Sequence, residues 1–78
     1  MEKLTNREHD VLVFIFYFKS EYGYAPTLRE IADGLYLSSH YTVQRHVEHL
    51  KEKGYITYSE KVSRSIRVTF QGYALLLA

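Results

Sequence analysis

A run of eight apolar and aromatic residues, VLVFIFYF at 11–18, dominates the pattern of this chain. A surface helix of a small domain needs apolar residues on about half of its positions, and a membrane-spanning helix needs about 20 in a row. The run matches neither case, but its flanks favour a helix. Thr5 and Glu8 fit a capping box, and Gly23 fits the glycine that commonly follows a helix. We therefore predict a helix over residues 6–22 with apolar side chains on two faces.

These two faces have different expected roles. The residues predicted to face the core, at helical spacing, are Val11, Phe14, Ile15, Phe18 and Tyr22. The residues that point the other way are Val13, Phe16 and Tyr17. A single core needs only one of the two faces, so another element is expected to cover the second.

A second, shorter helix follows an extended connection. Pro26 disfavours helix at the residue before it, and Thr27 with Glu30 fits another capping box. We predict a short helix from here through Leu35, followed by a turn at 34–37.

Ser38 or Ser39 can cap a third helix, which we predict to run to Lys53 and to be terminated by Gly54. Its narrow apolar stripe consists of Val43, Val47 and Leu50. The side opposite this stripe is expected to face solvent.

The rest of the chain has the alternating pattern of strands. Residues 55–59 and 65–69 each alternate with a period of two, and Thr69 can cap a closing helix over 70–78. The order of three helices, a two-stranded hairpin and a short C-terminal helix is that of a winged helix-turn-helix. We predict one α+β, mainly α domain over residues 1–78.

Charge and composition exclude few classes of function. Net charge is +1, with −2 over residues 1–33 and +3 over residues 51–78, so basic side chains gather toward the C-terminal half. The chain has no cysteine, which suits a cytoplasmic protein. No secretory leader or membrane segment is predicted.

The outward side of the third helix carries side chains that can read base edges. Arg can be bidentate to guanine, Gln to adenine, Glu can accept from cytosine, and a Thr methyl can touch thymine. A merely solvated helix face is more often filled with Lys and Glu. The predicted base-contacting residues are Ser39, Tyr41, Thr42, Gln44, Arg45 and Glu48.

Other residues are placed to contact the DNA backbone. The N-terminal amides of the third helix suit a phosphate, and the wing offers basic and hydroxyl side chains that can bind phosphate or enter the minor groove. The predicted backbone contacts are Thr27, Ser38, His40, Lys53, Lys61, Ser63 and Arg64.

Four segments of the chain resemble the N-terminal DNA-binding domain of the LexA repressor family. They are LTNRE at 4–8, YAPTLREIA at 24–32, SSHYTVQRHVEHLKEKGYI at 38–56 and SRSIRV at 63–68. The resemblance covers about residues 3–68. It implies a winged helix-turn-helix repressor that dimerises on palindromic operators of the SOS response in bacteria or their phages. It also implies base contacts at Ser39, Tyr41, Thr42, Gln44 and Arg45, with residues 61–64 near phosphate.

Two departures from the LexA pattern shape the expectation. LexA continues into a larger domain that dimerises and cleaves itself, and 78 residues leave no room for it. We therefore expect a repressor without self-cleavage, unless the chain is a fragment. The side chains at Tyr41, Gln44 and Arg45 also need not read an SOS box.

The apolar tail suggests how such a chain could dimerise. The segment 68–78 is too apolar to be left uncovered, and the second face of the first helix can cover it, within one chain or between two. The alternative is that both enlarge a single monomeric core. The predicted dimer or tail-packing residues are Val13, Phe16, Tyr17, Tyr73, Leu76 and Leu77.

Two other classes of function are weighed against DNA reading. A winged helix can serve as a protein-interaction module, for example an antirepressor or co-regulator that pairs with another transcriptional regulator, and the apolar excess favours this. His46 and His49 are too few for a zinc site, and a packing role is expected for His46. No nucleophile motif or phosphate loop predicts an enzyme, and no metal or cofactor is expected.

Overall fold

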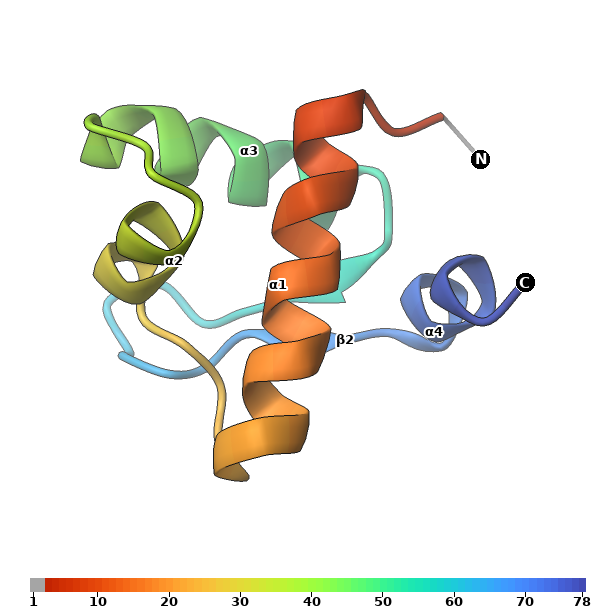
Figure 1. Ribbon diagram of the computed structural model, residues 1–78. Helices are drawn as coiled ribbons and strands as arrows, with labels where there is room; N and C mark the ends of the chain where they lie inside the picture. The colour runs from red at the N-terminus through yellow and green to blue at the C-terminus, as the bar shows by residue number, and fades with distance from the viewer. Residues whose placement is uncertain (1–2) are drawn as a thin grey trace.

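The computed structural model describes residues 3–78 and is mainly helical. Two helices stand beside a longer first helix, and the closing helix lies apart from them near the C-terminus (Figure 1). This is the predicted winged helix-turn-helix. Its elements are α1 (Asn6–Tyr22), α2 (Leu28–Gly34), α3 (His40–Glu52), β1 (Ile56–Thr57), β2 (Arg67–Val68) and α4 (Phe70–Leu76).

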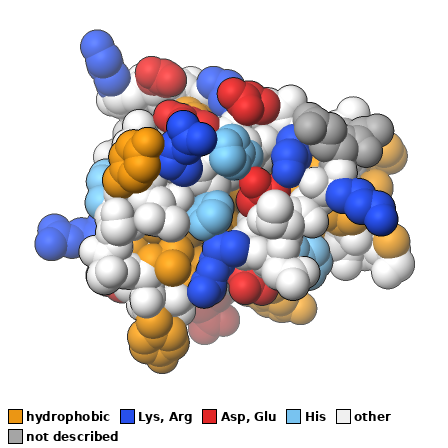
Figure 2. All heavy atoms as spheres, turned by 90° about the horizontal axis from the view of Figure 1, so that it is seen from above, with side chains coloured by type: hydrophobic (Ala, Val, Ile, Leu, Met, Phe, Trp, Pro, Cys, Tyr) orange, Lys and Arg blue, Asp and Glu red, His pale blue; other side chains and the backbone are white. Residues whose placement is uncertain are grey.

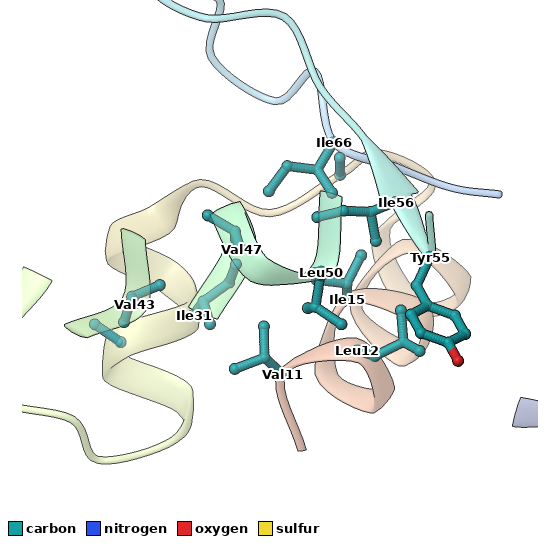
Figure 3. Close-up of a cluster of buried hydrophobic side chains, with 12 residues drawn as sticks. Val11, Leu12, Ile15, Ile31, Val43, Val47, Leu50, Tyr55, Ile56 and Ile66 are labelled. Carbon is teal, nitrogen blue, oxygen red and sulfur yellow. The ribbon is translucent and has the colours of Figure 1, made fainter. Parts of the chain in front are cut away.

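One hydrophobic core joins α1, α2, α3 and the two strands (Figure 3). Side chains from all of these elements converge in it, so the helix-turn-helix and the base of the wing share one support. The largest apolar side chains with almost no exposure are Val11, Leu12, Ile15, Ile31, Val43, Val47, Leu50 and Ile56.

Helix α1 begins and ends as predicted, but its buried face differs. Both hydrogen bonds of the Thr5–Glu8 capping box are present, and Gly23 ends the helix at φ 83°. The buried apolar face includes Leu12 and stops short of Tyr22, which is 57% exposed. The C-terminal end of α1 extends beyond the other helices (Figure 1). Tyr22 therefore contacts Phe18 instead of entering the core, with ring centroids 4.5 Å apart and the rings tilted by 44°.

The turn between α2 and α3 uses its residues in an unexpected way. Gly34 ends α2, and a Cβ there would lie 2.1 Å from the Phe14 ring, so the glycine makes room for close packing. The left-handed residue of the turn is Tyr36, at φ 57°. Ser39 then caps α3, because its hydroxyl accepts a hydrogen bond from the Thr42 backbone N–H.

The hairpin is shorter than predicted. Only Ile56–Thr57 and Arg67–Val68 form strands, paired antiparallel with Ile56 opposite Val68 and Thr57 opposite Arg67. Beyond them, side chains replace the ladder: the Ser65 hydroxyl accepts from the Ser59 N–H and donates to the Ser59 carbonyl, each at 3.0 Å. The third helix also ends one residue early, since Lys53 is its C-cap.

Helix α4 packs on the base of the wing, and its Leu76 packs against the core. Gly72 is buried, and a Cβ there would lie 2.4 Å from the Tyr55 carbonyl oxygen. Phe16 and Tyr73 meet edge to face at 5.8 Å, so the tail covers part of the second face of α1. Tyr17 and Leu77 stay 65% and 72% exposed. Within residues 3–78, no helix combines the length and apolar character needed to span a membrane.

Candidate nucleic-acid interface

Helix α3 is sharply two-sided. Val43, Val47 and Leu50 are buried against α1 and α2, as predicted. Buried residues on one stripe leave the opposite side to solvent, where Tyr41 is 67% exposed. The predicted base readers are therefore placed as follows: Tyr41, Gln44 and Arg45 are exposed, and Ser39, Thr42 and Glu48 are partly buried.

A cleft of about 520 Å³ separates α3 from the wing. Residues four apart on α3 lie on one row of the helix surface, and His40, Gln44 and Glu48 form the row that lines the cleft. Tyr41 and Arg45, also four apart, are not among its lining residues. The outward side of α3 therefore presents two rows, one facing the wing and one beyond it. From α2 and the wing, the cleft is lined by Thr27, Arg29, Lys61, Val62, Ser63 and Arg64, among others.

Four of the predicted readers are joined in two hydrogen bonds at α3. The Ser39 hydroxyl accepts from the Thr42 N–H at 3.3 Å, which makes Ser39 a helix cap. The Gln44 side-chain amide donates to Glu48 Oε2 at 3.4 Å, a long and exposed bond that a base edge can replace. Arg45 makes no ion pair with any residue that the structure describes.

Lys53 is held inside the fold. Its Nζ donates to Glu8 Oε1 at 2.6 Å and to the Lys3 carbonyl at 3.0 Å. Glu8 is 2% exposed, and His49 Nδ1 lies 3.1 Å from its second oxygen. Burial alone would raise the pKa of Glu8, but the hydrogen bonds from Lys53, the Thr5 N–H and His49, with the Lys53 charge, bring this pKa below its ordinary value. In this arrangement Lys53 is not free to bind a phosphate, and we assign it a structural role instead.

Arg64 is also held by the chain. Its guanidinium donates to both oxygens of Glu30, at 2.8 and 3.1 Å, and to the Ala25 carbonyl at 3.0 Å. Hydrogen bonds from Arg64 hold the pKa of Glu30 below its ordinary value. Arg64 thus has three hydrogen bonds within the chain, although its side chain is still 38% exposed and lines the cleft.

Arg29 and Lys61 also line the cleft, and unlike Arg64 they are not held by an ion pair to another described residue. Lys61 lies at the wing tip with φ 65°, next to Val62 and Ser63, and all three are exposed. Arg29 was missed by sequence reasoning, although its place two residues after the Thr27 cap would have put it on the exposed first turn of α2. Neither cation forms an ion pair within residues 3–78.

The view onto the α3 side shows acidic, basic and histidine side chains interspersed (Figure 2). The surface has no large patch of one sign in this view. His46 is half-buried, and burial lowers its pKa. Among the described residues, no group of three or more His, Cys, Asp or Glu side chains could hold a metal ion.

An exposed second helix of a helix-turn-helix, beside a hairpin across an open cleft, defines the winged helix class of DNA-binding domains. Comparison with known proteins narrows the class. The LexA DNA binding domain family model matches residues 1–65, and the chain belongs to this family.

Curated relatives agree with this assignment. The LexA repressor of Ligilactobacillus salivarius is 41% identical over 76 residues, which cover 97% of this chain and 37% of that repressor. The LexA repressor of Bacillus mycoides is 44% identical over 68 residues, which cover 87% of this chain and 33% of that repressor. The chain thus spans about a third of the length of the curated relatives it matches.

Proposed function

We propose that the chain binds double-stranded DNA sequence-specifically and acts as a transcriptional repressor, by occupying an operator and excluding polymerase. The observation that carries this is the outward side of α3, where Tyr41, Gln44 and Arg45 are exposed beside the cleft to the wing. Family membership supports the proposal, since the relatives are named LexA repressors.

In this proposal the two rows on α3 contact different base pairs in the major groove. Arg45 and Tyr41 meet one part of the half-site, and Gln44 with Glu48 meets the part nearer the wing. Thr42 lies beyond the Tyr41–Arg45 row, on the side away from the cleft, and in this proposal it offers its methyl group to a thymine. The proposed contacts to the DNA backbone are made by side chains that line the cleft, Thr27, Arg29, His40, Lys61 and Ser63, and by Ser38 before the α3 cap.

The test of base reading is Arg45→Ala. Loss of a bidentate Arg–guanine contact is expected to weaken binding by about 1–3 kcal/mol and to relax preference at one base pair of each half-site. Arg29→Ala should instead weaken binding to all sequences alike and lower the log–log salt slope by about one. Competition gel shifts with single-base variants of the selected duplex measure both, with Lys19→Ala on α1 as the control. Unchanged base preference in Arg45→Ala would contradict the proposal.

We also propose a homodimer on an inverted repeat. Free cations at the interface are few, so a single copy should bind weakly, and two copies on a two-fold axis read two half-sites. The partly uncovered surface of α1 and α4, with Tyr17, Tyr73 and Leu77 exposed, is the surface proposed to pair.

The same surface supports one alternative function. Exposed apolar patches mark interaction sites, and a partner such as another transcriptional regulator could bind there without any DNA contact by α3. Duplex binding that falls with salt and depends on Arg45 favours the repressor, whereas its absence favours the interaction module.

A further inference from the structure

A side chain of α3 contacts the first arm of the wing. Lys51 Nζ donates to the Tyr58 carbonyl at 3.1 Å, and its ammonium lies 4.3 Å from the centroid of the Tyr58 ring. The Ser59–Ser65 bonds close the two arms of the wing just beyond this point. The short tip that carries Lys61 and Ser63 is closed by one backbone hydrogen bond, from the Val62 N–H to the Ser59 carbonyl at 3.2 Å.

Arg64 ties the returning arm of the wing to α2. The planar guanidinium meets the Glu30 carboxylate with two parallel hydrogen bonds, a geometry that fixes orientation as well as distance. It also donates to the Ala25 carbonyl and lies 4.6 Å from the Tyr24 ring centroid. Glu30 is itself fixed, since its Oε1 accepts from the Thr27 N–H at 2.8 Å.

Arg64 has an unusual backbone conformation. Its φ of 58° lies in the left-handed region, which residues other than glycine rarely adopt and which persists when surrounding contacts over-determine it. A side chain with partners on α2 and on the loop before it provides such contacts. The conformation of the wing arm and the ion pair therefore support each other.

We propose that the Arg64–Glu30 pair is a positioning device that sets the wing against the helix-turn-helix, so that Lys61 and Ser63 meet DNA while α3 reads it. Arg64 is then a positioning residue and not a phosphate ligand. This inference rests on the proposed DNA-binding function, and its first test needs no DNA.

The first test measures wing order directly. The chain has no cysteine, so Val62→Cys at the exposed wing tip gives a single site for a nitroxide spin label. Glu30→Gln and Arg64→Lys each remove the paired ionic geometry while keeping a polar side chain. Both are expected to increase label mobility, whereas Asp33→Asn, an acid-to-amide change on the same helix, should not. Circular dichroism confirms that each variant is folded. Equal mobility in all four proteins would overturn the proposal.

The second test uses unlabelled protein and a duplex selected from a randomised pool, at full length and trimmed to the base pairs under α3. Glu30→Gln and Arg64→Lys should weaken binding to the full duplex roughly threefold or more and lower its salt slope by about one, since the wing loses a phosphate contact. Neither change should affect the trimmed duplex.

A direct phosphate role for Arg64 predicts the opposite for Glu30→Gln. That variant releases the guanidinium, so binding would be unchanged or tighter, and this result would overturn the positioning role. If the parent chain selects no sequence at all, the proposed function fails, and label mobility alone still decides whether the pair orders the wing.

Discussion

Glu8 is a charged residue that the fold buries almost completely. It lies on an exposed-looking first turn, yet its carboxylate is buried and paired with Lys53, which is 45 positions away. Removing one partner of a buried ion pair leaves the other uncompensated. We expect Glu8→Gln, which keeps an acceptor for the Thr5 N–H, to lower the free energy of unfolding by about 3 kcal/mol in urea titrations.

The direction of the Glu8 pKa shift predicts how the stability of the parent chain depends on pH. The pKa of Glu8 in the folded chain lies below its ordinary value of 4.5. The Glu8–Lys53 pair therefore makes its full contribution to folding stability above pH 4.5. This contribution is lost as the pH falls through the folded pKa. The parent should therefore lose more stability below pH 4.5 than Glu8→Gln does. As a control, Asp10→Asn removes an exposed pair at 3.7 Å and should change stability by less than about 0.5 kcal/mol. Parallel pH profiles for parent and Glu8→Gln would contradict this.

Tyr36 is the left-handed residue of the turn that ends α2, where its N–H donates to the Asp33 carbonyl at 3.3 Å and the Leu37 N–H donates to the Ala32 carbonyl at 2.9 Å. It holds a left-handed backbone at φ 57° and is 95% exposed. Because a Cβ in this region costs about 1–2 kcal/mol, Tyr36→Gly should raise the free energy of unfolding by about 1 kcal/mol. Tyr36→Ala keeps the Cβ and should bring no gain. Equal thermal stabilities for the glycine and alanine variants would show that the turn is not strained.

These residues mark the limit of prediction from the sequence. The caps at Thr5, Thr27 and Thr69 were predicted correctly, and Ser39 is one of the two caps predicted for α3, because each cap depends on a residue three positions away. The pairings of Glu8 with Lys53 and of Glu30 with Arg64 bring together residues 45 and 34 positions apart. No local pattern marks such a pair, so Lys53 and Arg64 looked like free cations.

At the scale of elements, α4 depends on a glycine that helix propensity disfavours. Replacing Gly72 with alanine would raise helix propensity by up to about 1 kcal/mol, but the added Cβ would meet the Tyr55 carbonyl. We expect Gly72→Ala to lower stability by about 1–3 kcal/mol through overpacking, and to expose α4 amides to hydrogen exchange. Gln71→Ala, at the exposed neighbouring position, should stay within about 0.5 kcal/mol. Stabilisation by Gly72→Ala would show that α4 does not pack this closely.

Side-chain hydrogen bonds explain why the strands of the wing are shorter than predicted. Alternation over 55–59 and 65–69 predicted two five-residue strands, but each strand spans two residues. The Tyr58 carbonyl is taken by Lys51, and Ser59 is paired through the Ser65 side chain. Side-chain bonds of this kind compete with a ladder, and alternation alone does not reveal them.

At the scale of the whole molecule, the surface left open on α1 and α4 is the surface proposed to form the dimer. Tyr17→Glu with Leu77→Glu changes side chains that are mostly exposed, so the fold should survive. If this surface forms the dimer, the double variant should sediment as a monomer, and its affinity for an inverted repeat should fall to that for a single half-site. Val13→Glu is unsuitable because Val13 is partly buried. Unchanged mass and affinity would exclude this surface as the dimer interface.

The measurement that tests the central claim most directly is selection of bound sequences from a randomised duplex pool at near-physiological salt. The proposed function predicts an inverted repeat whose half-sites contain a guanine, with preference at that base pair lost in Arg45→Ala. Recovery of unrelated sequences, held only by salt-sensitive contacts, would contradict it. In that case the outward side of α3 would not read DNA on its own.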